Sequence, residues 1–161
     1  MGQMIKVGMA DLKICKAPDA LTTIGLGSCI GIALYDPSTK ISGLAHIMLP
    51  DSTSIRNNSN IAKFADTGVE KLIEELRKQG VPQRALMAKM AGGARMFAFQ
   101  GSGDYLNIGE RNAEAVKGIL MKKGIPIVAS DCGGTYGRTI EFDPETYRLQ
   151  IRAIGKPEKY I

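Results

Sequence analysis

The chain has 161 residues, of which 44% are hydrophobic and 23% charged, and this is the composition of one globular domain rather than of a disordered polymer. Its apolar runs are far shorter than a membrane span, and its first residues lack the apolar segment of a signal peptide. The formal net charge is +5, but the basic residues are spread along the chain and aromatic residues do not alternate with them. We therefore expect a single domain over residues 1–161, no nucleic-acid partner and no membrane insertion; a basic surface also suits an acidic protein partner.

The first half of the chain has the pattern of short strands followed by a polar loop. Residues 5–15 and 20–24 mix apolar and polar positions, which is typical of short strands. The apolar runs 30–35 and 41–49 flank the turn residues 36–39 and predict a β-hairpin. Residues 50–60 are rich in Ser and Asn, so we expect a long loop, and long loops in compact domains are often functional.

The second half predicts two helices among further strands. Apolar residues recur at helical spacing from 61 to 78, where Gly80 and Pro82 end the pattern. A second helix is expected from about 108 to 123, with Asn107 as its N-cap. Strands are predicted at 85–90, 126–129, 139–142 and 147–154. The order of elements predicts an α+β fold, a layered α/β sandwich with mostly antiparallel strands and two main helices.

Two glycine-rich segments border predicted strands: residues 91–94 follow the strand 85–90, and residues 133–138 precede the strand 139–142. Residues 91–94 (Ala-Gly-Gly-Ala) lack the Lys-Ser/Thr ending of a phosphate loop, so we expect a tight turn with close backbone packing. Residues 133–138 (Gly-Gly-Thr-Tyr-Gly-Arg) suit either a simple turn or the rim of a site.

The one histidine of the chain, His46, lies in the predicted hairpin with Cys29. A thiol becomes a nucleophile when a base takes its proton, and imidazole is the usual base. If residues 36–39 form a four-residue loop, Tyr35 pairs with Lys40 and Cys29 lies directly opposite His46, on one face and within hydrogen-bond reach. A five-residue loop would send the two side chains to opposite faces unless a bulge intervened.

The other two cysteines, Cys15 and Cys132, are distant in sequence, and no Cys-x-x-Cys pair occurs. A disulfide framework is therefore not expected, and a reducing cytoplasm fits this pattern. Structural zinc sites use closely spaced ligand pairs, so we expect neither a metal nor a cofactor, although a zinc-stabilised domain is an alternative. A buried Cys29 and a satisfied core His46 are a further alternative.

Acyl-transfer chemistry at Cys29 also requires donors for a developing oxyanion and a group that orients the imidazole. Gly27 and Ser28 precede Cys29 and can present backbone N–H groups, as can Cys29 itself. Asp51 is the usual type of orienting residue near His46, and Thr22 and Thr23 lie on the strand before the glycines.

Several motifs together resemble one known family. They are residues 23–29 (Thr-Ile-Gly-Leu-Gly-Ser-Cys), 43–51 (Gly-Leu-Ala-His-Ile-Met-Leu-Pro-Asp), 63–67 (Lys-Phe-Ala-Asp-Thr), 89–94 (Lys-Met-Ala-Gly-Gly-Ala), 107–112 (Asn-Ile-Gly-Glu-Arg-Asn) and 133–138 (Gly-Gly-Thr-Tyr-Gly-Arg). In this order and spacing the sequence resembles the bacterial chemoreceptor glutamine deamidases, the CheD family, in the form found in Bacillus-like bacteria.

The resemblance implies an enzyme that hydrolyses glutamine side chains of chemoreceptors to glutamate, with methyl-ester hydrolysis as a further activity. It places the nucleophile at Cys29, the base at His46 and the third member at Thr23, and implies a fold related to cysteine deamidase toxins. It also implies a second partner, the response-regulator phosphatase CheC. Residues 92–94 (Gly92, Gly93 and Ala94) together with Phe97 and Phe99 are candidates for the surface that meets substrate or partner. A non-enzymatic regulatory protein with a docking cleft at this site is the alternative from another class.

Overall fold

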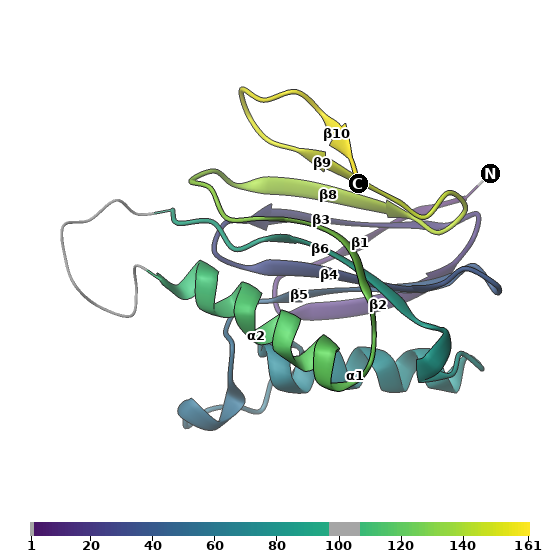
Figure 1. Ribbon diagram of the computed structural model, residues 1–161, viewed down its shortest axis with the longest axis horizontal. Coiled ribbons are helices and arrows are strands. Elements are labelled where there is room, and N and C mark those ends of the chain that lie inside the picture. Colours follow the sequence, from purple (N-terminus) through teal and green to yellow (C-terminus); the bar gives the residue numbers. More distant parts are fainter. Residues whose placement is uncertain (1, 97–106) are drawn as a thin grey trace.

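Two five-stranded sheets and two helices stack in three layers, in the order sheet, sheet, helices (Figure 1). The computed structural model describes residues 2–96 and 107–161. The outer sheet contains, in spatial order, β1 (Met4–Val7), β3 (Ala20–Leu26), β8 (Arg138–Asp143), β9 (Arg148–Arg152) and β10 (Lys159–Tyr160). The inner sheet contains β2 (Asp11–Lys16), β5 (Ile41–Ile47), β4 (Ile30–Asp36), β6 (Met87–Gly92) and β7 (Ile127–Cys132). The helices α1 (Ala65–Lys78) and α2 (Ile108–Lys122) lie against the free face of the inner sheet.

This architecture confirms the predicted α+β sandwich with two main helices. Parallel pairing joins β1 to β3 and β6 to β7, and every other described strand pairing is antiparallel. Short 3-10 turns η1 (Ser52–Ser54), η2 (Ile61–Lys63) and η3 (Gln83–Ala85) complete the described elements. Within residues 2–96 and 107–161, neither helix has the length and apolar character needed to cross a bilayer.

Two apolar cores hold the layers together. One lies between the helices and the inner sheet, and the other lies between the two sheets. Because both faces of the inner sheet are covered, every residue of its central strand β4 is buried, which explains the uninterrupted apolar run in the sequence. Members of the helix-side core include Leu34, Ile47, Leu72 and Val116, and members of the inter-sheet core include Leu26, Leu44, Ile140 and Phe142.

The hairpin of β4 and β5 forms as predicted, but its predicted register is wrong by two residues. Asp36 pairs with Ile41 and Tyr35 with Ser42, so the four-residue loop runs from 37 to 40 instead of 36 to 39. Asp36 remains in the strand because its carboxylate accepts hydrogen bonds from the Ser38 N–H and the Thr39 hydroxyl. A shift of two residues preserves the face on which each side chain lies.

The first helix begins later than its apolar spacing predicts. Phe64 is extended, and the N–H of Ala65 donates to the Leu49 carbonyl at 2.8 Å, so the chain pairs with a neighbouring segment before the helix begins at Ala65. Asn107 occupies the N-cap position of α2 without the predicted capping bond, because its Oδ1 accepts from Arg95 instead.

Candidate active site

The fold places His46 and Cys29 on the same side of the inner sheet, facing the outer sheet. His46 lies on β5 with none of its surface exposed, and its partner across the hairpin is Gly31 rather than Cys29. Cys29 lies two residues before Gly31, is 7% exposed and packs in the inter-sheet core. The two side chains are therefore diagonal neighbours across the hairpin rather than a directly opposed pair.

Thr23 of β3 contacts the imidazole from the outer sheet. Its Oγ1 lies 2.8 Å from His46 Nδ1 and also donates to the Val7 carbonyl at 2.7 Å. A hydroxyl has one proton, and the Val7 carbonyl receives it, so Oγ1 accepts the second bond from an Nδ1–H. This pairing sets the neutral tautomer of His46 and leaves the lone pair on Nε2.

Burial keeps both candidate reacting groups neutral. It lowers the pKa of His46 and raises the pKa of the Cys29 thiol. The N–H of Cys29 interacts with its own thiol and offsets part of that rise in pKa. His46 Nε2 has no hydrogen-bond partner among the residues that the structure describes, Cys29 included. The site therefore holds a neutral thiol and a neutral imidazole with one unused acceptor, which is the form that can take a thiol proton during a reaction.

Two expectations about the supporting groups change. Asp51 does not orient His46, because it is exposed and accepts hydrogen bonds from the Thr53 N–H and hydroxyl at the start of η1. The Gly27 N–H donates to the Gly25 carbonyl at 3.0 Å, which occupies it. Within the described part of the chain, the N–H groups of Ser28 and Cys29 have no backbone acceptor, so they are the donors that remain for an oxyanion.

The turn formed by residues 92–94 supports the Cys29 loop from behind. The Gly93 N–H donates to the Cys29 carbonyl at 2.9 Å, and the Ala94 N–H donates to the Gly27 carbonyl at 2.8 Å. Gly92 has a φ of +116°, and a Cβ there would lie 2.2 Å from the Cys29 oxygen, so only glycine fits. Residues 92–94 are buried and act here through their backbones. Phe97 and Phe99 fall outside the described residues.

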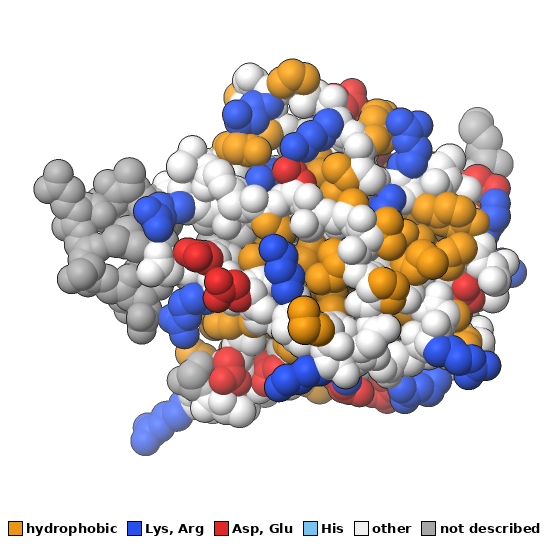
Figure 2. Space-filling view, viewed as in Figure 1, with side chains coloured by type: hydrophobic (Ala, Val, Ile, Leu, Met, Phe, Trp, Pro, Cys, Tyr) orange, Lys and Arg blue, Asp and Glu red, His pale blue; other side chains and the backbone are white. Residues whose placement is uncertain are grey.

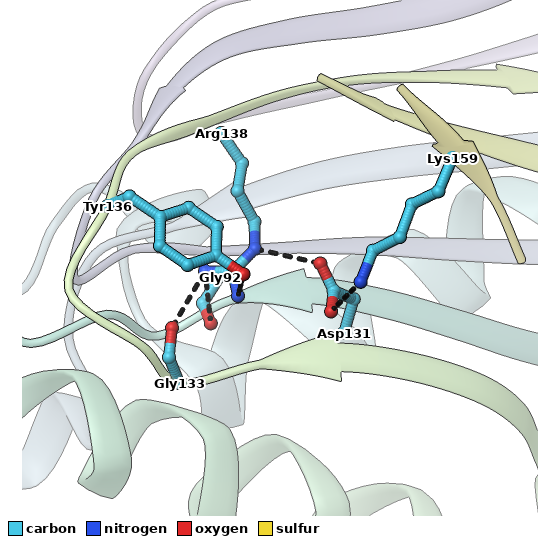
Figure 3. Close-up of polar contacts among 6 residues, drawn as sticks. All are labelled: Gly92, Asp131, Gly133, Tyr136, Arg138 and Lys159. Carbon is cyan, nitrogen blue, oxygen red and sulfur yellow. Dashed lines mark hydrogen bonds and ion pairs between the residues drawn. The ribbon is translucent and has the colours of Figure 1, made fainter. Parts of the chain in front are cut away.

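A buried arginine network, which the sequence motifs alone do not identify, fixes this turn (Figure 3). Arg138 of β8 pairs with Asp131 of β7 at 3.0 Å, joining the two sheets, and Lys159 donates to the same carboxylate at 2.8 Å. The Nη1 of Arg138 donates to the carbonyls of Gly133 and Gly92 at 2.9 and 3.4 Å. Gly92 precedes Gly93, whose N–H donates to the Cys29 carbonyl. The network therefore supports the candidate nucleophile indirectly.

Two pockets adjoin the residues that contact the Cys29 loop. One, of about 540 Å³, is lined by Gly93 and by charged side chains from the N-terminal part of α2. Figure 2 shows charges of both signs gathered over that part of the helix. The other, of about 740 Å³, is lined by Gly25 and by Met96, whose side chain lies against Gly27. Among the described residues, no three His, Cys, Asp or Glu side chains are arranged to hold a metal ion.

Comparisons with known proteins show which family the chain belongs to. Residues 48–153 match the family model CheD, described as CheD chemotactic sensory transduction. The chain is 59% identical, over all 161 residues and the full length of the relative, to the probable chemoreceptor glutamine deamidase CheD of Lachnoclostridium phytofermentans. The chain belongs to the CheD family. It is also 51% identical over 162 aligned positions, covering 100% of both chains, to the chemoreceptor glutamine deamidase CheD of Halalkalibacterium halodurans.

The family-model match begins at residue 48, after all three candidate site residues, whereas the CheD relatives align along the entire chain. Membership in the CheD family therefore does not depend on how Cys29, His46 and Thr23 are interpreted. Among solved structures, the Bacillus licheniformis hypothetical protein YfiH aligns with 72% of this chain and 46% of its own, with a TM-score of 0.40 and 15% identity.

Proposed function

We propose that this chain hydrolyses glutamine side chains of bacterial chemoreceptors to glutamate, with Cys29 as nucleophile, His46 as base and Thr23 as the residue that orients the base. The observation that carries the proposal is the paired Nδ1 and unpaired Nε2 of a buried His46, on the same side of the sheet as Cys29. The substrate class follows from the names of the full-length CheD relatives.

In the first half of the reaction, His46 Nε2 accepts the thiol proton as the Cys29 sulfur attacks the carboxamide carbon. The carbonyl oxygen becomes an oxyanion, and the N–H of Cys29, with that of Ser28, stabilises it. The intermediate collapses, the C–N bond breaks, and the imidazolium returns its proton to the departing ammonia. The product on the enzyme is a thioester between Cys29 and the receptor side chain.

In the second half, His46 Nε2 accepts a proton from a water molecule that attacks the thioester carbon. The C–S bond breaks, the sulfur regains a proton from the imidazolium, and the receptor carries a glutamate. Because the same acyl carbon occurs in a glutamyl methyl ester, the site can hydrolyse that ester with methanol as the leaving group. Either reaction adds a negative charge to the receptor, which suits a role in chemotactic adaptation.

Thr23 is a weaker orienting group than a carboxylate. A hydroxyl fixes the tautomer but carries no charge to offset the imidazolium that forms in each half-reaction. Modest turnover follows from this choice of residue.

We place the reaction in the cytoplasm, since the three cysteines are all free, as expected of a reducing compartment. A CheC-type response-regulator phosphatase is proposed as a second partner, meeting the enzyme near the pocket that Gly93 lines. Phosphatase added in excess should then slow deamidation of a receptor fragment, and Glu114→Lys, which changes an exposed residue lining the same pocket, should reduce this inhibition.

The test is incubation of the purified chain with a chemoreceptor cytoplasmic fragment, followed by ammonia assay and peptide mass mapping. We expect ammonia release together with a mass gain of about one dalton at each modified glutamine, as hydrolysis of an amide requires. Cys29→Ala should abolish ammonia release. Cys15→Ser is its matched control, because Cys15 is buried between Asp19 and Ser42 and has no part in the reaction. Binding of the fragment without ammonia release would instead support a regulatory docking protein.

A further inference from the structure

The carbonyl of Ser28, immediately before Cys29, accepts a hydrogen bond from a buried side chain that the proposed reaction does not use. Asn112 of α2 has none of its surface exposed, and its Nδ2 donates to the Ser28 carbonyl and to the Met48 carbonyl, each at 2.9 Å. One acceptor precedes the candidate nucleophile, and the other follows His46 by two residues. Asn112 therefore joins the two segments that carry the chemistry.

The contacts of this amide show which part of it matters. Both acceptors are carbonyl oxygens, so only the NH₂ group can face them. The other amide atom, Oδ1, is buried and has no partner among the described residues, which is unfavourable for folding. An apolar side chain of similar size would avoid that penalty, so packing does not account for an asparagine here. What Asn112 supplies is a pair of donors.

The geometry of the peptide bond links these donors to the reaction. The Ser28 carbonyl and the Cys29 N–H belong to one planar group and point in opposite directions. When Asn112 draws the carbonyl toward α2, the N–H is turned away from α2. The side chain of Cys29 packs in the inter-sheet core, on the other side of the inner sheet from α2, so an N–H turned away from α2 lies on the side of the thiol.

We propose that Asn112 is a positioning residue that aims the Cys29 N–H at the oxyanion of the tetrahedral intermediate. The inference rests on the proposed function, since it assumes that Cys29 is the nucleophile. Asn112 itself does not touch substrate. Its loss should therefore lower kcat while leaving KM and the intrinsic reactivity of the thiol nearly unchanged.

The experiment compares Asn112→Leu with Val116→Ala, a matched control that also alters a buried residue of α2, one turn later and in the helix-side core. For each we measure kcat and KM on a receptor fragment, and the rate of iodoacetamide alkylation of Cys29 from pH 6 to 10 by peptide mapping. Alkylation involves no oxyanion, so its limiting rate at high pH, where the thiol is ionised, reports the thiolate without the oxyanion donor. Removing an oxyanion donor costs about 10²–10³-fold in kcat, and a misdirected donor should cost about 10–100-fold.

The proposal is supported if Asn112→Leu loses kcat to that extent while its limiting alkylation rate at high pH is unchanged, and if Val116→Ala retains wild-type kcat. An unchanged kcat, or alkylation that falls in proportion to kcat, overturns the proposal. If the leucine variant does not fold, Asn112→Ser keeps one hydroxyl donor and should lose about 3–10-fold in kcat under the same criteria. Turnover by Cys29→Ala would refute the proposed function itself, whereas an inactive Cys29→Ala with a fully active Asn112→Leu refutes this inference alone.

Discussion

Replacing Thr23 by Val removes one hydroxyl from the centre of the site while keeping the shape of the side chain. Two buried groups then lose their partner, the Val7 carbonyl and the Nδ1–H of His46. Leaving each unpaired costs about 1–3 kcal/mol, so the free energy of unfolding should fall by roughly 2–6 kcal/mol. The imidazole also loses the contact that sets its tautomer, and a proton on Nε2 prevents it from accepting the thiol proton. A general base contributes about 10²–10⁴-fold, so partial loss of its orientation should lower kcat about 10–100-fold.

Urea unfolding and steady-state deamidation measure the two effects separately, with Thr23→Ser as the control that restores the hydroxyl. The serine variant should recover most of the stability and of kcat. The alkylation rate of Cys29 near neutral pH should fall in Thr23→Val, because Nε2 is then protonated in part of the molecules. If Thr23→Val keeps kcat within about twofold of wild type, or if Thr23→Ser is equally impaired, the assignment of Thr23 is wrong.

Four further predictions concern the groups that support the nucleophile and the base. Gly92→Ala adds a Cβ 2.2 Å from the Cys29 oxygen and about 1–3 kcal/mol of backbone strain, so kcat should fall more than about tenfold. A fully active variant in the same assay would contradict the role of this turn in holding the Cys29 loop. Arg138→Met leaves Asp131 without its buried partner and should lower the free energy of unfolding by about 3 kcal/mol in urea, whereas a loss below about 1 kcal/mol would show that the pair contributes little. Because burial lowers the pKa of His46 below its ordinary 6.5, kcat/KM should hold as the pH falls through 6.5 and decline only at lower pH, and an acid limb centred above 6.5 would rule out His46 as the base. The same shift makes the unfolded chain bind a proton that the folded chain does not, so unfolding free energy should decrease as the pH falls below 6.5, and less so in His46→Gln.

The spacing of apolar residues and the residue types of the turns predict most of the fold. The apolar run of β4 and the helical spacing of α1 are local signals, and both elements form, although α1 begins at Ala65 rather than at residue 61. The hairpin register is not a local property, because it depends on whether Asp36 belongs to the strand or to the loop. Its carboxylate accepts two hydrogen bonds across the turn, and that contact decides the pairing. The start of α1 likewise depends on the pairing of Phe64 with Leu49, a contact between two loops.

The supporting residues of the site come from distant parts of the chain, which explains why the sequence did not identify them. Arg138 and Asp131 belong to different sheets, and the Val7 carbonyl that fixes the Thr23 hydroxyl is a backbone atom without a sequence signature. Asn112 offered one signal, a polar residue on the same stripe of α2 as Val116, where an apolar residue is the usual choice.

The most direct test of the central claim is the intact mass of the enzyme during turnover. A mixture of the chain and a chemoreceptor fragment, quenched in acid, should contain a covalent species with the summed mass of both chains less one ammonia, linked through Cys29. The species should disappear in Cys29→Ala together with all ammonia release. Continued ammonia release by Cys29→Ala, or a linkage at Cys15 or Cys132, would contradict the account.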